Sequence, residues 1–258
     1  MKWIKWIVDL IASLFGGTTA SRKRASMDDL LFVAGLDYHW SEIDPKDLCA
    51  KAVAARAHAI GCELGEKMNT GPQGVITDVA NYYPKKIKQF KALVEQARKS
   101  GLWVKVCFWN TNAKAGKTVS ADTLKRMFDL FKREIGTDGV LVVPMSEFDG
   151  NTPNRVRADV LKYVLANWPN SQVVVMDSDS GSALWHETHL SRTETRLSGR
   201  PHFFCVTDHP VTLADNVSHE TMMKCAAAVR RGGMSFHYYG FETKPNMDDW
   251  KAIGDLYA

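Results

Sequence analysis

Short apolar segments rich in Val, Ile and Phe recur along the chain from residue 31 onward, and segments with helical spacing lie between them. The predicted strands are residues 31–37, 74–79, 102–108, 138–144, 171–177, 202–207 and 232–238. The predicted helices, in which apolar residues recur every three or four positions, are 47–60, 84–99, 120–135, 154–167, 183–197, 212–230 and 247–257. Successive strands begin roughly 30–40 residues apart, which is the length of one strand–helix unit.

Nearly continuous apolar strands that alternate with helices are typical of a parallel sheet covered by helices. About seven such units fit between residue 31 and residue 258, and Asp44, Ser120 and Asn246 are suitable helix N-caps. The sequence therefore predicts an α/β fold, a (β/α)₈ TIM barrel or an incomplete seven-stranded variant. An open doubly wound sheet is the alternative. It is disfavoured because no glycine-rich phosphate-binding turn follows the first strand.

The first 26 residues differ from the rest of the chain in charge. They carry five Lys and Arg residues against Asp9, a net charge of +4, which is also the formal net charge of the whole chain. Residues 27–258 therefore hold 28 basic and 28 acidic residues. A basic, nucleic-acid-binding body is disfavoured, and we expect no nucleic-acid partner.

Residues 3–15 have the pattern of an amphipathic helix, with Ile4, Ile7, Ile11 and Leu14 on one face. This segment is too short to span a bilayer, which needs about 20 residues. It suits docking on a membrane surface or in a partner's groove. Packing on the protein's own body is an alternative. A signal peptide is another, although Asp9 interrupts the apolar segment.

The predicted organisation is an amphipathic helix and basic tether over residues 1–26 and a TIM-barrel-like domain over 27–258. Deletion of residues 1–26 is then expected to leave the barrel folded. The cysteines are odd in number and form no Cys-x-x-Cys pair: Cys49, Cys62, Cys107, Cys205 and Cys225. Buried thiols are expected, which indicates folding in a reducing cytoplasm. The N-terminal helix then suggests assembly into a particle or attachment at a membrane.

Polar and aromatic side chains gather after the predicted strands, whereas the residues that enter the strands are mostly Gly, Ser, Pro and Gln. A parallel barrel builds its active site at the carboxyl ends of its strands. Aromatic rings stack on the C–H faces of sugars, and polar side chains bond to the hydroxyls. The pattern predicts a carbohydrate-binding mouth; the alternative is that strand ends are polar because they meet water. The expected substrate-binding residues are Asp37, His39, Trp40, Asp78, Tyr82, Trp109, Asn110, Asp149, His209, His237, Tyr238 and Tyr239.

Glycoside hydrolysis needs two carboxyl groups on either side of one bond, one protonated and one ionised. Glu147 follows the apolar segment 138–144, and partial burial would raise its pKa as a general acid requires. An ion-paired surface carboxylate is the alternative interpretation of Glu147. The candidates for the second carboxylate are Asp208, Glu242 and Asp177.

The segment Pro-Met-Ser-Glu-Phe-Asp-Gly at 144–150 resembles the strand-four motif of the family 26 glycoside hydrolases. These are clan-A barrels that act on mannans and related β-glycans. The resemblance covers about seven residues and implies that Glu147 is the acid/base residue. The chain departs from the motif at Val143, Ser146 and Asp149, where the family often has Arg, His and Asn.

In that clan the nucleophile is a Glu at the end of strand seven. Here the predicted seventh strand leads into His237, Tyr238 and Tyr239, and Glu242 comes a few residues late. Three possibilities stay open: Glu242 reaches back, Asp208 or Asp177 serves, or there is no nucleophile. In the last case the barrel would bind sugars without cleaving them or would use an inverting mechanism.

Metal chemistry fits the pattern less well. His39, His209 and His237 could surround a metal with Asp37 or Asp208, but no His-x-His pair closes the first strand. We therefore expect no metal and no cofactor. Two classes remain: a glycosidase acting on a polysaccharide or peptidoglycan-type glycan, and a non-catalytic glycan-binding or structural barrel. The latter would be anchored by its N-terminal helix in a larger assembly such as a phage particle.

Overall fold

The computed structural model describes residues 22–36, 39–64, 84–109, 121–146, 154–176, 185–190, 203–207, 219–233, 235–238 and 244–258. Within these residues, eight strands form one sheet in the order β4-β3-β2-β1-β8-β7-β6-β5. The strands are β1 (Phe32–Gly35), β2 (Ala59–Leu64), β3 (Trp103–Trp109), β4 (Val140–Ser146), β5 (Val174–Met176), β6 (Trp185–Leu190), β7 (Phe203–Thr207) and β8 (Ser235–Tyr238). The helices are η1 (Trp40–Glu42), α2 (Pro45–Ala54), α4 (Pro84–Lys99), α5 (Ala121–Ile135), α6 (Asn154–Asn167), η4 (Asn170–Gln172), α7 (His219–Arg231) and α8 (Met247–Tyr257).

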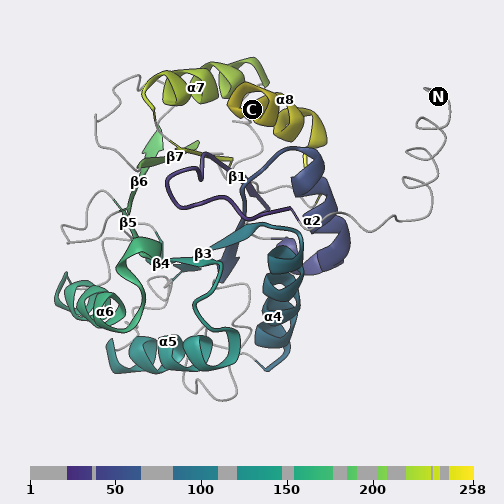
Figure 1. Cartoon of the computed structure of the whole chain (residues 1–258). Helices are drawn as coiled ribbons and strands as arrows, with labels where there is room; N and C mark the ends of the chain where they lie inside the picture. The colour runs from purple at the N-terminus through teal and green to yellow at the C-terminus, as the bar shows by residue number, and fades with distance from the viewer. Residues whose placement is uncertain are drawn as a thin grey trace.

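All pairings in this sheet are parallel, and β1 pairs with β8, so the first and last strands are neighbours. At the two ends of the sheet order, β4 and β5 meet through the parallel bridge between Val142 and Val173 rather than through a named ladder. The six α-helices described surround this ring of strands (Figure 1). The predicted barrel architecture is confirmed, as a sheet that is not fully closed between β4 and β5.

Two of the expected N-caps are confirmed by hydrogen bonds. Asp44 Oδ1 accepts from the backbone N–H groups of Lys46 (2.8 Å) and Asp47 (3.3 Å) at the start of α2. Asn246 Oδ1 accepts from the N–H of Asp249 at 3.3 Å at the start of α8. Each bond satisfies a helix N–H group that has no partner within the helix. Ser120 lies outside the described residues.

The second strand of the sheet is β2, and the segment 74–79 predicted for this place lies outside the described residues. The predicted helix 47–60 ends at Ala54, because Arg56 adopts a left-handed conformation (φ 57°) and the N–H of Ala57 bonds to the carbonyl of Ala52 at 2.9 Å. Such a helix stop usually has Gly at the left-handed position. With Arg there, and with Ala59 continuing the helical spacing, nothing in the pattern marked the end of the helix.

The eighth strand, which the sequence pattern did not reveal, is β6. It lies inside 183–197, so the helix predicted there is wrong. It pairs with β5 through Val174 and Trp185 and with β7 through His186 and Phe203. β6 reads Trp-His-Glu-Thr-His-Leu, in which most positions are polar. It is therefore not an apolar segment of the kind expected for a strand buried between helices.

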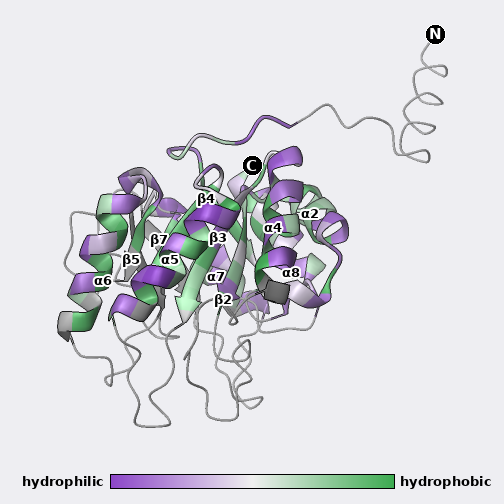
Figure 2. Ribbon diagram, turned by 90° about the horizontal axis from the view of Figure 1, so that it is seen from below, coloured by the Kyte–Doolittle hydropathy of each residue, from purple (hydrophilic) through white to green (hydrophobic). Residues whose placement is uncertain are grey.

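Two apolar layers stabilise the barrel. Side chains that alternate along each strand face either the helices or the barrel interior. In the outer layer, the ring of Phe131 on α5 lies 5.2 Å from that of Phe90 on α4 and 5.1 Å from that of Phe108 on β3. The hydrophobic residues of the helices lie on the faces turned toward the strands (Figure 2). The inner layer is a cluster of Leu30, Val33, Ala59, Trp103, Cys107, Leu141, Val143 and Val174.

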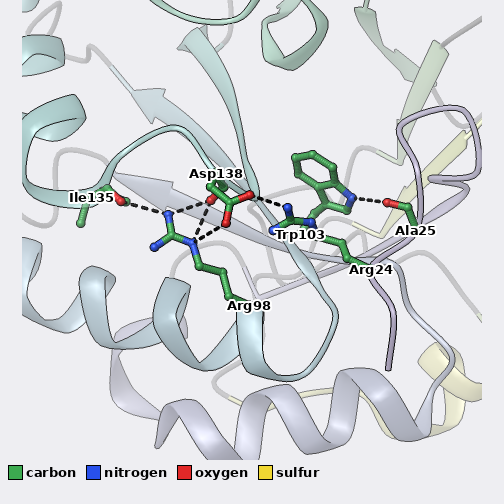
Figure 3. Close-up of polar contacts among 6 residues, drawn as sticks. All are labelled: Arg24, Ala25, Arg98, Trp103, Ile135 and Asp138. Atoms are coloured by element: carbon green, nitrogen blue, oxygen red, sulfur yellow. Dashed lines mark hydrogen bonds and ion pairs between the residues drawn. The ribbon is translucent and has the colours of Figure 1, made fainter. Parts of the chain in front are cut away.

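The segment 22–26 packs on the amino end of the barrel. Arg24 stacks over the ring of Trp103 at 4.5 Å and forms an ion pair with Asp138, which precedes β4 (Figure 3). The indole N–H of Trp103 donates to the carbonyl of Ala25 at 2.9 Å, and Arg22 Nη1 donates to the carbonyl of Ala57 at 3.0 Å. The hydrogen bond from Arg24 lowers the pKa of Asp138. We call residues 22–26 the base segment; it was predicted to be tether. That residues 1–21 form a helix and tether separate from the barrel stays a prediction.

His58 joins the base of β2 to its neighbours and is expected to make stability depend on pH. Its Nδ1 accepts from the N–H of Phe32 at 3.3 Å. Burial, and secondly the charge of Arg22, lower the pKa of His58 below its ordinary 6.5. The folded state thus favours the neutral ring. Below pH 6.5 the unfolded chain binds more protons, and the free energy of unfolding falls as the pH falls toward the lowered folded-state pKa.

The His58→Asn variant should lose this contribution, because an amide oxygen can accept the Phe32 bond without titrating. The difference in slope between wild type and variant should not exceed about 1.4 kcal/mol per pH unit, the limit for one proton. Urea unfolding of both proteins at several pH values between about 5 and 7.5 measures it. Parallel pH dependences in the two proteins would contradict the assignment to His58.

Candidate functional site

Four polar side chains lie on the inward-facing positions of their strands, inside the barrel. They are Glu63 on β2, Lys105 and Cys107 on β3, and His237 on β8, and none is more than 3% exposed. Glu63, Cys107 and His237 lie one or two residues before the carboxyl ends of their strands. The cluster therefore lies toward the end of the barrel where parallel barrels carry their active sites. We refer to these four residues as the inner polar cluster.

Lys105 is the centre of the inner polar cluster. Its Nζ lies 3.0 Å from Nδ1 of His237 and 3.6 Å from Sγ of Cys107. The register places Gly61 of β2 next to Lys105, and Gly35 of β1 next to Gly61. Because neither glycine has a side chain, the inward face of β2 and β1 leaves space for the lysine stem to extend toward β8.

The inner polar cluster is costly for stability, since a buried charge loses several kcal/mol of hydration that only well-placed partners restore. Barrel interiors are normally filled by branched apolar side chains. Buried ionisable groups that gather at the catalytic end of a barrel therefore indicate a functional role. The cluster is the described part of the candidate site.

Glu63 and Lys105 were not among the site residues predicted from the sequence. The signal was present in each strand: Lys105 interrupts the apolar segment 102–108, and Glu63 ends the apolar part of β2. Side chains alternate along a strand, so Glu63, four residues after inward-facing Ala59, also faces inward. The same holds for Lys105, two residues after inward-facing Trp103. A charge at an inward position of a buried strand is a stronger indication of function than a polar residue beyond the strand end.

The predicted site residues within the described ranges do not all lie together. His237 belongs to the inner polar cluster. His39 lies before η1, where its Nδ1 is 2.9 Å from Oε1 of Glu42. Trp109 is the last residue of β3 and pairs in register with Ser146 of β4.

Trp40 and Tyr238 lie between the sheet and the helices, which corrects the expectation that their rings line the mouth. Trp40 is 2% exposed, its indole donates to the carbonyl of Glu63 at 2.9 Å, and its ring packs edge-on against Phe90. Tyr238 is fully buried with its ring 6.5 Å from that of Trp250 on α8. Tyr238 is inside β8, not beyond it, so its alternation turns it toward the helices.

The remaining predicted site residues lie outside the described residues: Asp37, Asp78, Tyr82, Asn110, Glu147, Asp149, Asp177, Asp208, His209, Tyr239 and Glu242. Their positions in the chain are nevertheless fixed relative to the strands. Glu147 directly follows β4, Asp177 directly follows β5, and Asp208 directly follows β7. Glu242 comes after β8, which is the strand predicted to be the seventh.

The four cysteines whose side chains are described carry thiols rather than disulfides: Cys49, Cys62, Cys107 and Cys225. Burial raises the pKa of Cys49 to about 12, so its thiolate is absent at neutral pH. Among the described residues, no group of three or more His, Cys, Asp and Glu side chains could hold a metal ion. No helix in the described ranges has the length and apolar character needed to cross a membrane.

Comparison with solved structures places the chain among barrel glycosidases in fold. An endoglucanase from Pseudomonas stutzeri, solved with cellobiose, matches with a TM-score of 0.61 at 11% identity, over 89% of this chain and 92% of that one. A tri-modular endo-β-1,4-glucanase of glycoside hydrolase family 5 from Bacillus licheniformis matches with a TM-score of 0.62 at 9% identity, over 90% and 60%. An α-L-fucosidase from Paenibacillus thiaminolyticus matches with a TM-score of 0.56 at 11% identity, over 88% and 73%.

No protein-family model and no curated protein matches the sequence. The chain therefore has the fold shared by the family 5 glycoside hydrolases and related glycosidases, which supports the distant clan-A resemblance. The narrower resemblance of residues 144–150 to family 26 is not confirmed by these matches. At these identities the shared feature is the fold alone.

Proposed function

We propose that this chain is a glycoside hydrolase that cleaves a polysaccharide or peptidoglycan-type glycan, with Glu147 as general acid and Asp208 as the second carboxylate. One observation carries the proposal: these carboxylic residues directly follow β4 and β7 of an eight-stranded parallel sheet. The clan-A resemblance implies an acid after strand four and a nucleophile at the end of strand seven. Once β6 is counted, Asp208 occupies the second of these places.

The sheet supports a substrate site between the two carboxylates. β4 and β7 are three strands apart through β5 and β6 and five apart through β1, so their ends face each other across the barrel. Val206 of β7 pairs in register with His237, and Asp208 is two residues further along. Ser146 of β4 pairs with Trp109 of β3, and Glu147 is the next residue. Both candidates therefore follow strands connected through the sheet to the inner polar cluster.

Asp208 also bears on the stereochemistry of hydrolysis. An Asp is one methylene shorter than the Glu that the clan has at this place, which increases the separation of the two carboxyl groups. Retaining enzymes have a separation of about 5–5.5 Å, and inverting enzymes about 6.5–9.5 Å to admit a water. The shorter side chain favours inversion, with Asp208 as the base that activates water.

The test is release of reducing ends by the full chain from a panel of cellulose-type β-glucan, β-mannan and peptidoglycan, with binding to each glycan measured in parallel. Release from at least one glycan supports the proposal. Binding without release favours the second class, a non-catalytic glycan-binding barrel. Neither binding nor release on the whole panel contradicts a carbohydrate function.

The attachment of the base segment favours a second proposal, that residues 1–21 anchor the barrel to a membrane surface or a larger assembly. Arg22 lies at the amino end of the strands, beside Ala57, and residue 21 is covalently joined to it. The anchor would therefore leave the barrel at the end opposite the proposed site. A barrel held in this way keeps its mouth accessible to an extended glycan.

A further inference from the structure

The contact between Lys105 and His237 restricts where the imidazole can carry its proton. A lysine ammonium has three N–H donors and no acceptor. Nδ1 of His237 lies 3.0 Å from Nζ of Lys105, so with Lys105 charged this nitrogen accepts the hydrogen bond. A ring nitrogen that accepts carries no proton, and the neutral ring then has its proton on Nε2.

We propose that Lys105 is a positioning residue that holds His237 in the Nε2–H tautomer, so that the ring offers a hydrogen-bond donor at Nε2. On substrate binding this N–H would donate to an oxygen of the glycan or of a catalytic carboxylate, and this part rests on the proposed function. Neutral histidine is ambiguous because either nitrogen can carry the proton. The ammonium removes the ambiguity before substrate binds.

The surroundings of Lys105 fix its ammonium in place. Its side chain is fully buried, its register neighbours toward β1 are Gly61 and then Gly35, and Sγ of Cys107 provides a second contact at 3.6 Å on the same strand. His237 is equally buried on β8. Both side chains thus come from strands of the sheet, β3 and β8, rather than from loops. A donor held in this way loses little entropy when it binds a ligand oxygen.

The same 3.0 Å contact would also arise with the proton placement reversed, a neutral amine accepting from Nδ1–H. Nitrogen-15 NMR of the imidazole separates the two arrangements, because protonated and unprotonated ring nitrogens have well-separated shifts. The full chain labelled at its eight histidines is used, and the His237→Gln variant assigns the signal by its loss. The wild type should show protonated Nε2 and unprotonated Nδ1 for His237.

The Lys105→Met variant keeps the length of the stem and removes the ammonium. We expect the Nδ1–H tautomer of His237 to become detectable in it. On a glycan that the wild type cleaves, kcat should fall roughly 10- to 100-fold with little change in KM, the range for loss of a group that orients another. Lys224→Met is the matched control: it makes the same change on α7, where the side chain is 74% exposed, and should leave both tautomer and kcat unchanged.

An Nδ1–H tautomer in the wild type overturns the proposal, and so does a tautomer unchanged in Lys105→Met. If that variant does not fold, the wild-type spectrum alone still decides, because the proposal requires Nε2–H. The spectra need no substrate. A chain that cleaves no glycan would therefore contradict the proposed function while the Lys105–His237 result stood by itself.

Discussion

Replacement of Glu147 by Gln should reduce glycan hydrolysis by a factor of about 10²–10⁴ without loss of glycan binding, because Gln keeps the shape of the side chain and cannot donate an acidic proton. Asp208→Asn should cause a loss of similar size, since the amide can serve neither as nucleophile nor as base. Initial rates of reducing-end release give kcat, affinity for the uncleaved glycan gives binding, and thermal unfolding verifies that each variant is folded.

The matched controls are the other carboxylates proposed for the second role. Asp177→Asn changes the residue after β5, and Glu242→Gln changes the carboxylate beyond β8. Both should retain most of the wild-type kcat. A loss of kcat in Glu242→Gln but not in Asp208→Asn or Asp177→Asn would assign the role of second carboxylate to Glu242. Full activity of Glu147→Gln would show that Glu147 is not the general acid.

The variant that combines Glu147→Gln and Asp208→Asn should be little worse than either single variant, because the proposed mechanism has both carboxylates act in one reaction. Catalytic groups that act as a unit show such non-additive losses. Independent, additive losses would indicate that one of the two residues affects substrate binding instead. The anomeric form of the first product, followed by proton NMR, then tells inversion from retention in the wild type.

The barrel could be predicted because most of its strands are apolar and separated by amphipathic helices, a pattern with few alternative folds. The strands that were missed show where the pattern fails. β2 was hidden because Arg56, not Gly, takes the left-handed position after α2. β6 was hidden because it is mostly polar. Each is recognised from its parallel pairing with neighbours, which is information that spacing along the chain does not contain.

The site was predicted less well, because the sequence shows which residues follow a strand but not which face each residue takes. Tyr238 and His237 are adjacent, yet the first packs on Trp250 and the second contacts Lys105. Their separation follows from the two-residue period of a strand once the strand is known to extend to Tyr238. Lys105 was overlooked because a single charge in an apolar strand does not change the predicted element.

Deletion of residues 1–26 should lower the free energy of unfolding by roughly 2–4 kcal/mol, whereas deletion of residues 1–21 should not. The barrel should still fold without residues 1–26, as expected from the sequence, but with lower stability. The larger deletion removes the bonds from Arg22 to Ala57 and from Trp103 to Ala25, and it uncovers an indole that is only 6% exposed. The Arg24–Asp138 pair adds little, because the carboxylate is 67% exposed.

Thermal and urea unfolding of the two truncated chains measure the difference, and a loss of this size corresponds to a fall of about 5–15 °C in Tm for a chain of this length. Lys23→Ala is the matched point control for Arg24→Ala, since Lys23 is exposed and carries the same charge. Only the Arg24 variant should be destabilised. Equal stability of the two truncated chains would show that the base segment does not support the barrel.

Two glycine substitutions test the contact between Arg24 and the barrel in the full-length chain. Gly136 and Gly139 both have left-handed backbones, with φ of 76° and 69°, so a change to Ala strains each by a similar amount, about 1–2 kcal/mol. A Cβ at Gly139 would lie 2.3 Å from Nη1 of Arg24, whereas at Gly136 the nearest atom is 3.9 Å away. Gly139→Ala should therefore be the more destabilising in the full chain, because it also displaces Arg24. In the chain lacking residues 1–26 the two variants should become equal. If Gly139→Ala remains more destabilising than Gly136→Ala in the truncated chain, the effect arises within the barrel and not from the contact of Gly139 with Arg24.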